Sequence, residues 1–267
     1  MMTGFSRTGL PGKALRAAVG VLLLWSSQMP GFHLGAQQDS TGEPDVVPDP
    51  VVAPRAAQDP VEDPVPVLLV PGWMDGAEEL EPLQSSFVEA GWPLGSVRAV
   101  DFADPVGSSR EHAEEVAAAA RGLRRMTGSS VVDVVAHSMG GLAVRHYLKR
   151  VSEDRDSTGV RKVVFLATPH RGTVAAWLAW GEGGDEMQPG SPFLDSLNAG
   201  DVVPGSVEAL AVQTPLDLRV IPGESALLPE AGNTRNLEIC CPTHPGLLDH
   251  QDTFRAVVDF LREEEEE

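Results

Sequence analysis

Between residues 66 and 262, short apolar runs alternate with segments whose apolar residues recur every three or four positions. This alternation constrains the fold more than any other feature of the chain. The runs predict strands that are apolar on both faces, and the segments between them predict helices. The predicted strands are 65–70, 97–102, 131–136, 160–167, 218–221 and 237–240, and the predicted helices are 78–90, 109–126, 142–151 and 253–261. Such an order predicts the α/β class, with a mostly parallel sheet of about six strands and helices on both faces.

The N-terminal residues have a different composition. Three basic residues precede a nine-residue apolar run at 17–25, and small residues follow at 34–36, a pattern typical of a secretory signal peptide. A core helix or an uncleaved anchor is the alternative. The next segment repeats proline and aspartate, which predicts an extended linker or an interaction tail. We therefore expect a signal peptide over 1–36, a linker over 37–65, one folded domain over 66–262, an acidic tail over 263–267, and a secreted or periplasmic location.

Charge and composition exclude several classes of function. Asp and Glu number 39 against 20 Lys and Arg, a net charge of -19 that repels nucleic-acid backbones. No apolar run reaches the ~18 residues of a spanning helix. The two cysteines, Cys240 and Cys241, are adjacent and match no metal spacing, so they are either free thiols or a vicinal disulfide. Because phosphate-loop, dinucleotide and zinc patterns are absent from the sequence, we expect no cofactor and no metal.

The segment Ala136-His137-Ser138-Met139-Gly140-Gly141 stands between a predicted strand and a predicted helix. A sharp strand-to-helix turn with small residues two positions before and after a serine exposes the serine hydroxyl as a nucleophile. The alternative is a purely structural role, in which Ser138 caps the helix at an ordinary turn. The double glycine and the flanking elements favour Ser138 as a nucleophile.

At these residues the chain resembles the α/β-hydrolase superfamily, and within it the small bacterial triacylglycerol lipases. The resemblance covers about 66–262. It rests on four segments in the same order: 69–73 (Leu-Val-Pro-Gly-Trp), 136–141, 167–173 (Ala-Thr-Pro-His-Arg-Gly-Thr) and 243–248 (Thr-His-Pro-Gly-Leu-Leu). It implies an α/β-hydrolase fold and the hydrolysis of carboxylic esters. Pro71 stands where these lipases usually carry a histidine.

A serine nucleophile needs a general base and an acid that orients it. His244 follows the last predicted strand and precedes the last helix, the position expected for the base when the order is Ser, acid, His. Glu224 is the first carboxylate after the strand expected at 218–221, so we expect it to be the acid. Related lipases usually carry aspartate there. Asp217 and Glu230 are the alternatives, although Asp217 would lie at the start of that strand.

Two backbone N–H groups are expected to hold the oxyanion. One belongs to Met139, the residue after the nucleophile. The resemblance implies Trp73 as the other. Residues 174–200 interrupt the strand and helix rhythm, and could form a small cap or lid in which Trp177 and Trp180 bind the substrate. The alternative is a helix whose tryptophans only pack on the sheet.

These features predict a secreted serine hydrolase that cleaves esters of acyl glycerols through an acyl-enzyme. The partners we expect are a lipid or ester substrate and, transiently, a lipid surface, for a monomeric protein. A short-chain carboxylesterase, an acyltransferase and an inactive hydrolase-fold binding module are the alternatives.

Overall fold

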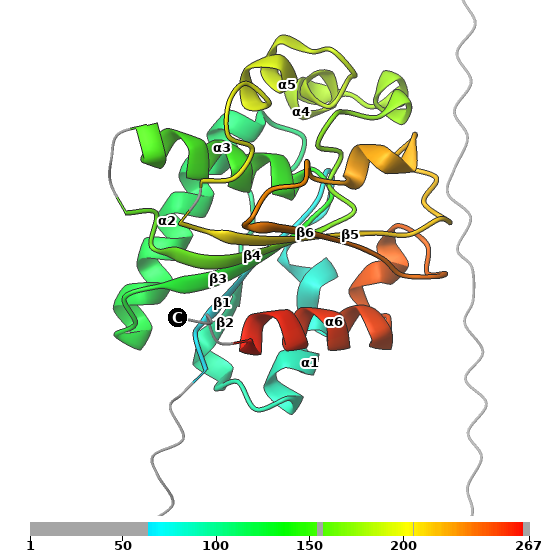
Figure 1. The fold of residues 1–267 in the computed structure, drawn as a ribbon. Helices are drawn as coiled ribbons and strands as arrows, with labels where there is room; N and C mark the ends of the chain where they lie inside the picture. Colours follow the sequence, from blue (N-terminus) through cyan, green and yellow to red (C-terminus); the bar gives the residue numbers. More distant parts are fainter. Residues whose placement is uncertain (1–63, 154–156, 205, 264–267) are drawn as a thin grey trace, which may run out of the picture. The chain divides into compact units, whose positions relative to one another are not determined.

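The computed structural model describes residues 64–153, 157–204 and 206–263. The expected signal peptide, and most of the expected linker and acidic tail, lie outside these residues. Within them the chain forms one six-stranded parallel sheet with the strand order β2-β1-β3-β4-β5-β6 (Figure 1). The strands are β1 (Val67–Val70), β2 (Val97–Ala99), β3 (Val132–His137), β4 (Val160–Leu166), β5 (Glu208–Gln213) and β6 (Thr234–Glu238).

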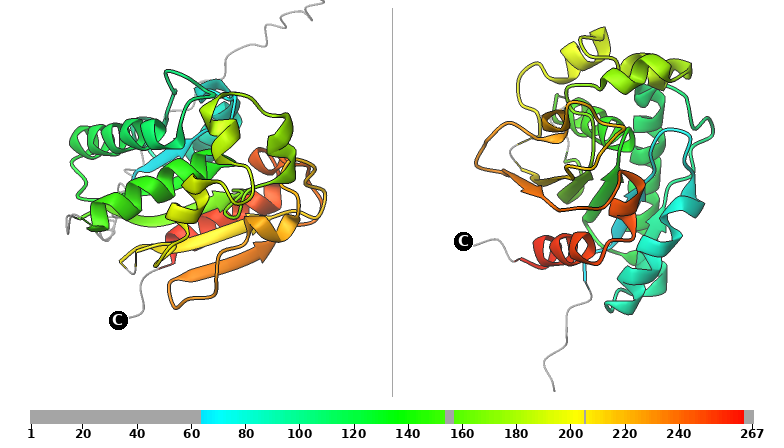
Figure 2. Two further views of the ribbon diagram at one scale, coloured as in Figure 1. Left: turned by 90° about the horizontal axis from the view of Figure 1, so that it is seen from above. Right: turned by 90° about the vertical axis from the view of Figure 1, so that its right-hand side faces the viewer.

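Helices cover both faces of the sheet, as the two further views also show (Figure 2). One face packs on α2 (Ser109–Thr127) and α3 (Gly140–Glu153), through a cluster that includes Val116, Val134 and Leu148. The other face packs on α1 (Glu81–Glu89) and α6 (Gln251–Arg262), through a cluster that includes Leu69 and Val257. The predicted α/β architecture is therefore confirmed.

The remaining helical elements are short. Two of them, α4 (Gly181–Glu186) and α5 (Pro192–Leu197), lie with the 3₁₀ turn η3 (Val174–Leu178) between β4 and β5. The other 3₁₀ turns are η1 (Ala77–Leu80), η2 (Leu94–Ser96), η4 (Gly223–Ala226) and η5 (Pro245–Leu248). None of the described helices is both long and apolar enough to cross a membrane.

The prediction of a strand at 218–221 is wrong. The fifth strand is β5, and residues 218–221 form a bend outside the sheet, in which Leu218 is 81% exposed and Val220 is buried. The apolar stretch of β5 has four residues between Glu208 and Gln213, and two of them are alanines. Alanine is uncommon in strands, so the sequence pattern did not indicate this one. In 218–221 the aliphatic residues flank Arg219, and they lie outside the sheet. This shift of one element changes which acidic residue follows the fifth strand.

Candidate active site

Ser138 occupies the turn between β3 and α3, and its backbone has a φ of 52°. A non-glycine residue with positive φ is strained, as a serine in a nucleophile turn is expected to be. Its N–H donates to the carbonyl oxygen of Leu166 at 2.8 Å, which fixes the turn to the end of β4. A Cβ on Gly140 would collide with the carbonyl oxygen of Pro71, so only glycine fits at the start of α3.

His244 follows β6, and its imidazole is oriented by a carboxylate. Its Nδ1–H donates to Oδ2 of Asp217 at 2.7 Å, and the two side chains are 2% and 4% exposed. A carboxylate only accepts, so the proton of the neutral imidazole stands on Nδ1. Nε2 is then a bare acceptor, and it is buried without a hydrogen-bond partner among the described residues. This is the state that a general base requires before it takes a proton.

The residue before the nucleophile connects His244 to the turn. Nε2–H of His137 donates to the backbone carbonyl oxygen of His244 at 3.2 Å, and the two rings lie 4.7 Å apart. Burial lowers the pKa of His137 to about 3, and the nearby His244 lowers it further while the hydrogen bond opposes the shift. His137 is therefore neutral at ordinary pH, and it holds the backbone of His244 next to Ser138.

The expectation for the acid needs correction. The structure does not bring Glu224 to His244: Glu224 lies exposed in η4, and its backbone carbonyl accepts a hydrogen bond from Arg171. The carboxylate on the imidazole belongs to Asp217 instead. Since the fifth strand ends at Gln213, Asp217 lies in the loop at the carboxyl end of the sheet. Asp217 is the first carboxylate after β5, so the order serine, acid, histidine is kept with the correct fifth strand.

The surroundings of Asp217 favour its charged form. Its Oδ1 accepts hydrogen bonds from the backbone N–H groups of Arg219 and Val220, each at 2.8 Å. Burial raises the pKa of Asp217, but the hydrogen bond from His244, the charge of that ring and the two backbone bonds together hold the pKa below its usual value. The carboxylate is thus an anion that can stabilise a protonated His244.

Two backbone N–H groups border the nucleophile. The loop after β1 lies against Ser138, because a Cβ on Gly72 would be 3.1 Å from the Cβ of Ser138. In the described part of the chain, no acceptor takes a hydrogen bond from the N–H of Trp73 or of Met139. The next residue, Met74, has a φ of 65°, and its own N–H donates to Pro105. The two expected oxyanion donors are therefore unengaged.

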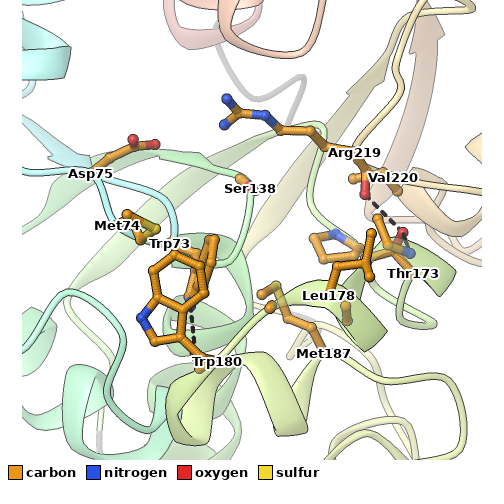
Figure 3. A pocket seen from close by; sticks show the side chains of 14 residues that line it. Trp73, Met74, Asp75, Ser138, Thr173, Leu178, Trp180, Met187, Arg219 and Val220 are labelled. Carbon is orange, nitrogen blue, oxygen red and sulfur yellow. Dashed lines mark hydrogen bonds between the residues drawn. The ribbon is translucent and has the colours of Figure 1, made fainter.

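Ser138 opens into a pocket of about 460 Å³. Trp73, Leu178, Trp180 and Met187 form an apolar wall on one side of the nucleophile (Figure 3). Trp73 and Trp180 contact each other edge to face, with ring centroids 4.7 Å apart, and Nε1–H of Trp73 donates to the carbonyl oxygen of Trp180. The volume lies within the usual range for small-molecule sites.

The segment between β4 and β5 forms a cap over the nucleophile turn. Its inner face packs on Met139 through an apolar cluster that includes Ala176, Met187 and Leu194. Trp180 lines the pocket as expected, but Trp177 does not. The turn η3 directs the neighbours of Trp177 into the pocket and leaves its indole 67% exposed. Trp177 therefore lies outside the pocket lining, and its expected contact with the substrate stays a prediction.

Hydrogen bonds fasten the cap to the sheet domain. Glu186 of α4 accepts from the hydroxyl of Ser108 at 2.7 Å and from the N–H of Ser109 at 2.6 Å, so it binds the start of α2. The buried guanidinium of Arg145 donates to the carbonyl of Leu197 and to the side chain of Asn198, just after α5. These contacts tie both halves of the cap to helices of the core.

Exposed apolar side chains are concentrated in the chain segments that contribute residues to the pocket. Of the ten large hydrophobic residues exposed in the described part of the chain, eight lie in the three segments that frame the pocket. They are Met74, Val174, Trp177, Leu178, Trp180, Leu216, Leu218 and Ile221. We call these eight residues the apolar rim. A concentration of exposed apolar surface at one site is typical of contact with an apolar partner.

Among residues 64–153, 157–204 and 206–263, no group of three His, Cys, Asp or Glu side chains could hold a metal ion. Cys240 and Cys241 are joined by a disulfide in the loop between β6 and His244.

Comparison with a family model agrees with this geometry. Residues 98–177 match the model described as "Alpha/beta hydrolase of unknown function (DUF915)". This region contains β3, the nucleophile turn and the start of the cap.

Solved structures with the same fold include several lipases. Aspergillus fumigatus lipase B superposes with a TM-score of 0.65 at 20% identity, over 75% of this chain and 53% of that one. The chain thus spans about half the length of the fungal lipase. The mature Bacillus licheniformis lipase BlEst2 superposes with a TM-score of 0.60 at 18% identity, over 80% of this chain and 96% of that one. A gene product of Listeria innocua gives 0.58 at 16% identity, over 77% and 96%. The chain therefore has the α/β-hydrolase fold, and the solved structures that share this fold with it include lipases.

Proposed function

We propose that this protein is a serine hydrolase that cleaves carboxylic esters of acyl glycerols. The observation that carries the proposal is the state of His244. Its Nδ1 is bound to Asp217, its Nε2 is buried without a hydrogen-bond partner among the described residues, and its ring lies 4.7 Å from the ring of His137, the residue before Ser138. A hydroxyl adjacent to such a base is an activated nucleophile.

In the first half of the reaction, His244 Nε2 takes the proton of Ser138 as its Oγ attacks the ester carbonyl. The negative charge that develops on the carbonyl oxygen is met by the N–H groups of Trp73 and Met139. His244 then gives the proton to the departing alcohol, and the acyl group stays on Ser138. The charge on Asp217 stabilises the imidazolium while it exists.

In the second half, water replaces the alcohol. His244 takes a proton from the water as it attacks the acyl-enzyme, and returns it to Oγ of Ser138 as the fatty acid leaves. The pocket residues and the apolar rim support the substrate class, because an acyl chain would lie against Leu178, Trp180 and Met187. The rim would contact a lipid surface that presents such chains.

Hydrolysis of a graded ester series tests this proposal. The series runs from p-nitrophenyl acetate to the decanoate and includes a short-chain diacylglycerol, each offered to the wild type and to Ser138→Ala. We expect rates that rise with chain length, and a loss of at least about 10³-fold in kcat for Ser138→Ala. Cleavage of the acetate alone would favour a short-chain esterase. Equal rates for the two proteins, or none for either, would contradict the proposal.

We also propose that residues 1–36 direct export, from the charge order and apolar length of that segment. N-terminal sequencing of the exported protein is expected to begin after Ala36. An intact start at Met1 would contradict cleavage.

A further inference from the structure

The pocket wall carries two charged side chains, Asp75 and Arg219, among residues that are otherwise apolar or neutral. Asp75 belongs to the loop after β1, and Arg219 to the loop after β5. In the view of Figure 3, Asp75 lies to the upper left of Ser138 and Arg219 to its upper right, whereas the apolar wall lies below it. An ester bound at Ser138 therefore meets an apolar surface at one end and a charged surface at the other.

Neither charge forms an ion pair with an oppositely charged side chain in the described ranges. Burial and the charge of Glu79 raise the pKa of Asp75, and the charges of Arg219 and His244 only partly oppose this shift. The guanidinium of Arg219 is exposed, and no ion pair or hydrogen bond joins it to residues 64–153, 157–204 or 206–263. The carboxylate of Asp75 is only 22% exposed, and its closest ionisable neighbour is Nδ1 of His137 at 3.8 Å. His137 offers no positive charge, because burial lowers its pKa to about 3.

These two charges restrict the charge of a substrate group that can bind over them. A substrate that closes the pocket removes water from both groups, and an uncompensated charge that loses water is costly. An uncharged acylglycerol would offer neither group a partner, and would leave only their attraction to each other. A purely anionic group would satisfy Arg219 but would repel Asp75. A zwitterionic group compensates both.

We propose that the ester cleaved at Ser138 carries a zwitterionic group on its alcohol side, with the anionic part bound by Arg219 and the cationic part directed to Asp75. A guanidinium matches the paired oxygens of a phosphate, and a carboxylate matches an ammonium. The substrate class is thus an acylglycerol with a phospho-amino-alcohol head group. The inference rests on the proposed ester hydrolysis. The acyl group passes to Ser138 Oγ, and the alcohol leaves with its head group intact and one proton from His244.

Three lipids with identical hexanoyl chains test this inference: dihexanoyl glycerol, dihexanoyl phosphatidylglycerol and dihexanoyl phosphatidylethanolamine. The values of kcat/KM are compared below the micelle concentration. For the wild type we expect the zwitterionic lipid to exceed the neutral one by about tenfold, since one charged contact supplies a factor of this size. Arg219→Gln is expected to remove this preference, and Arg219→Lys to keep part of it.

The role of Asp75 is tested by a second ratio of kcat/KM values. Asp75→Asn is expected to lower the ratio of the zwitterionic to the anionic lipid by about tenfold, because only the ammonium loses its partner. Arg255→Gln is the matched control. Arg255 is exposed on α6, where it pairs with Asp252 outside the pocket, and both ratios should stay at their wild-type values.

Each outcome separates this inference from the proposed function. A wild type that cleaves the neutral lipid as fast as the zwitterionic one overturns the inference and leaves ester hydrolysis in place. A preference for the anionic lipid overturns the part assigned to Asp75. Failure to cleave any of the three lipids or the p-nitrophenyl esters contradicts the proposed function itself.

Discussion

Oδ2 of Asp217 lies 2.7 Å from Nδ1 of His244, although the two residues are 27 positions apart and follow different strands. The contact fixes the imidazole tautomer and leaves Nε2 free for Ser138. It also singles out one carboxylate among three candidates. We therefore expect Asp217→Asn to lower kcat by roughly 10³- to 10⁴-fold, because an amide cannot stabilise the imidazolium.

Glu224→Gln is the matched control for that substitution. Glu224 is exposed and its side chain does not meet His244, so kcat for p-nitrophenyl butyrate should stay within about twofold of the wild type. The reverse pattern, with an active Asp217→Asn and an inactive Glu224→Gln, would refute the assignment of the acid.

His137 makes the stability of the fold depend on pH. In the folded chain its pKa is lowered to about 3 from 6.5, chiefly by burial. Below pH 6.5 the unfolded chain binds a proton that the folded chain does not. The stabilisation is therefore complete above pH 6.5 and is lost as the pH falls toward 3, by about 1.4 kcal/mol per pH unit.

Urea unfolding at pH 7 and pH 4.5 measures this effect. We expect the free energy of unfolding to fall more in the wild type than in His137→Asn. Some dependence should remain in the variant, because burial and two arginines also lower the pKa of His170. Equal losses in both proteins would show that His137 is not a neutral buried group.

Gly140 is required where α3 passes the loop after β1. An added methyl would meet the carbonyl oxygen of Pro71, so Gly140→Ala is expected to cost about 1–3 kcal/mol of stability and to lower activity. Gly122→Ala in α2 is the control, because its Cβ would meet no atom within 4 Å. It should stabilise the protein by about 0.5–1 kcal/mol. Destabilisation of similar size in both would mean that crowding at Pro71 is not the cause.

Glu186 lies in the segment between β4 and β5, and its carboxylate accepts hydrogen bonds at the N-terminus of α2. Its side chain is 12% exposed. Glu186→Ala removes the acceptor for two donors, and we expect a loss of about 1–2 kcal/mol in the free energy of unfolding. Glu182→Ala, an exposed position of the same helix, should change it by less than about 0.5 kcal/mol. A larger effect at Glu182 would refute the role given to Glu186.

Local patterns predicted the parts of the site that a few neighbouring residues determine. The turn at Ser138 needs small residues and flanking elements, all within six positions, and its backbone is strained as expected. The position of His244 between the last strand and the last helix is similarly local. The parallel sheet with helices on both faces followed from the alternation of apolar runs and amphipathic segments, although its strand order did not.

The parts that depend on pairing between distant segments could not be read in this way. Asp217 is identified only once β5 is known, and two of the four apolar residues of that strand are alanines, which give a weak strand signal. The contact of His137 with His244 joins residues that are 107 positions apart. The direction in which Trp177 points depends on the backbone of a single 3₁₀ turn. No spacing rule connects such residues.

Reaction with a fluorophosphonate, followed by intact-protein mass spectrometry and peptide mapping, tests most directly whether Ser138, His244 and Asp217 act together. The reagent mimics the tetrahedral intermediate and reacts only with an activated serine. We predict one adduct on Ser138 of the wild type, none on Ser138→Ala, and strongly slowed labelling of Asp217→Asn. A folded wild type that stays unlabelled, or that is labelled at another residue, would contradict the account.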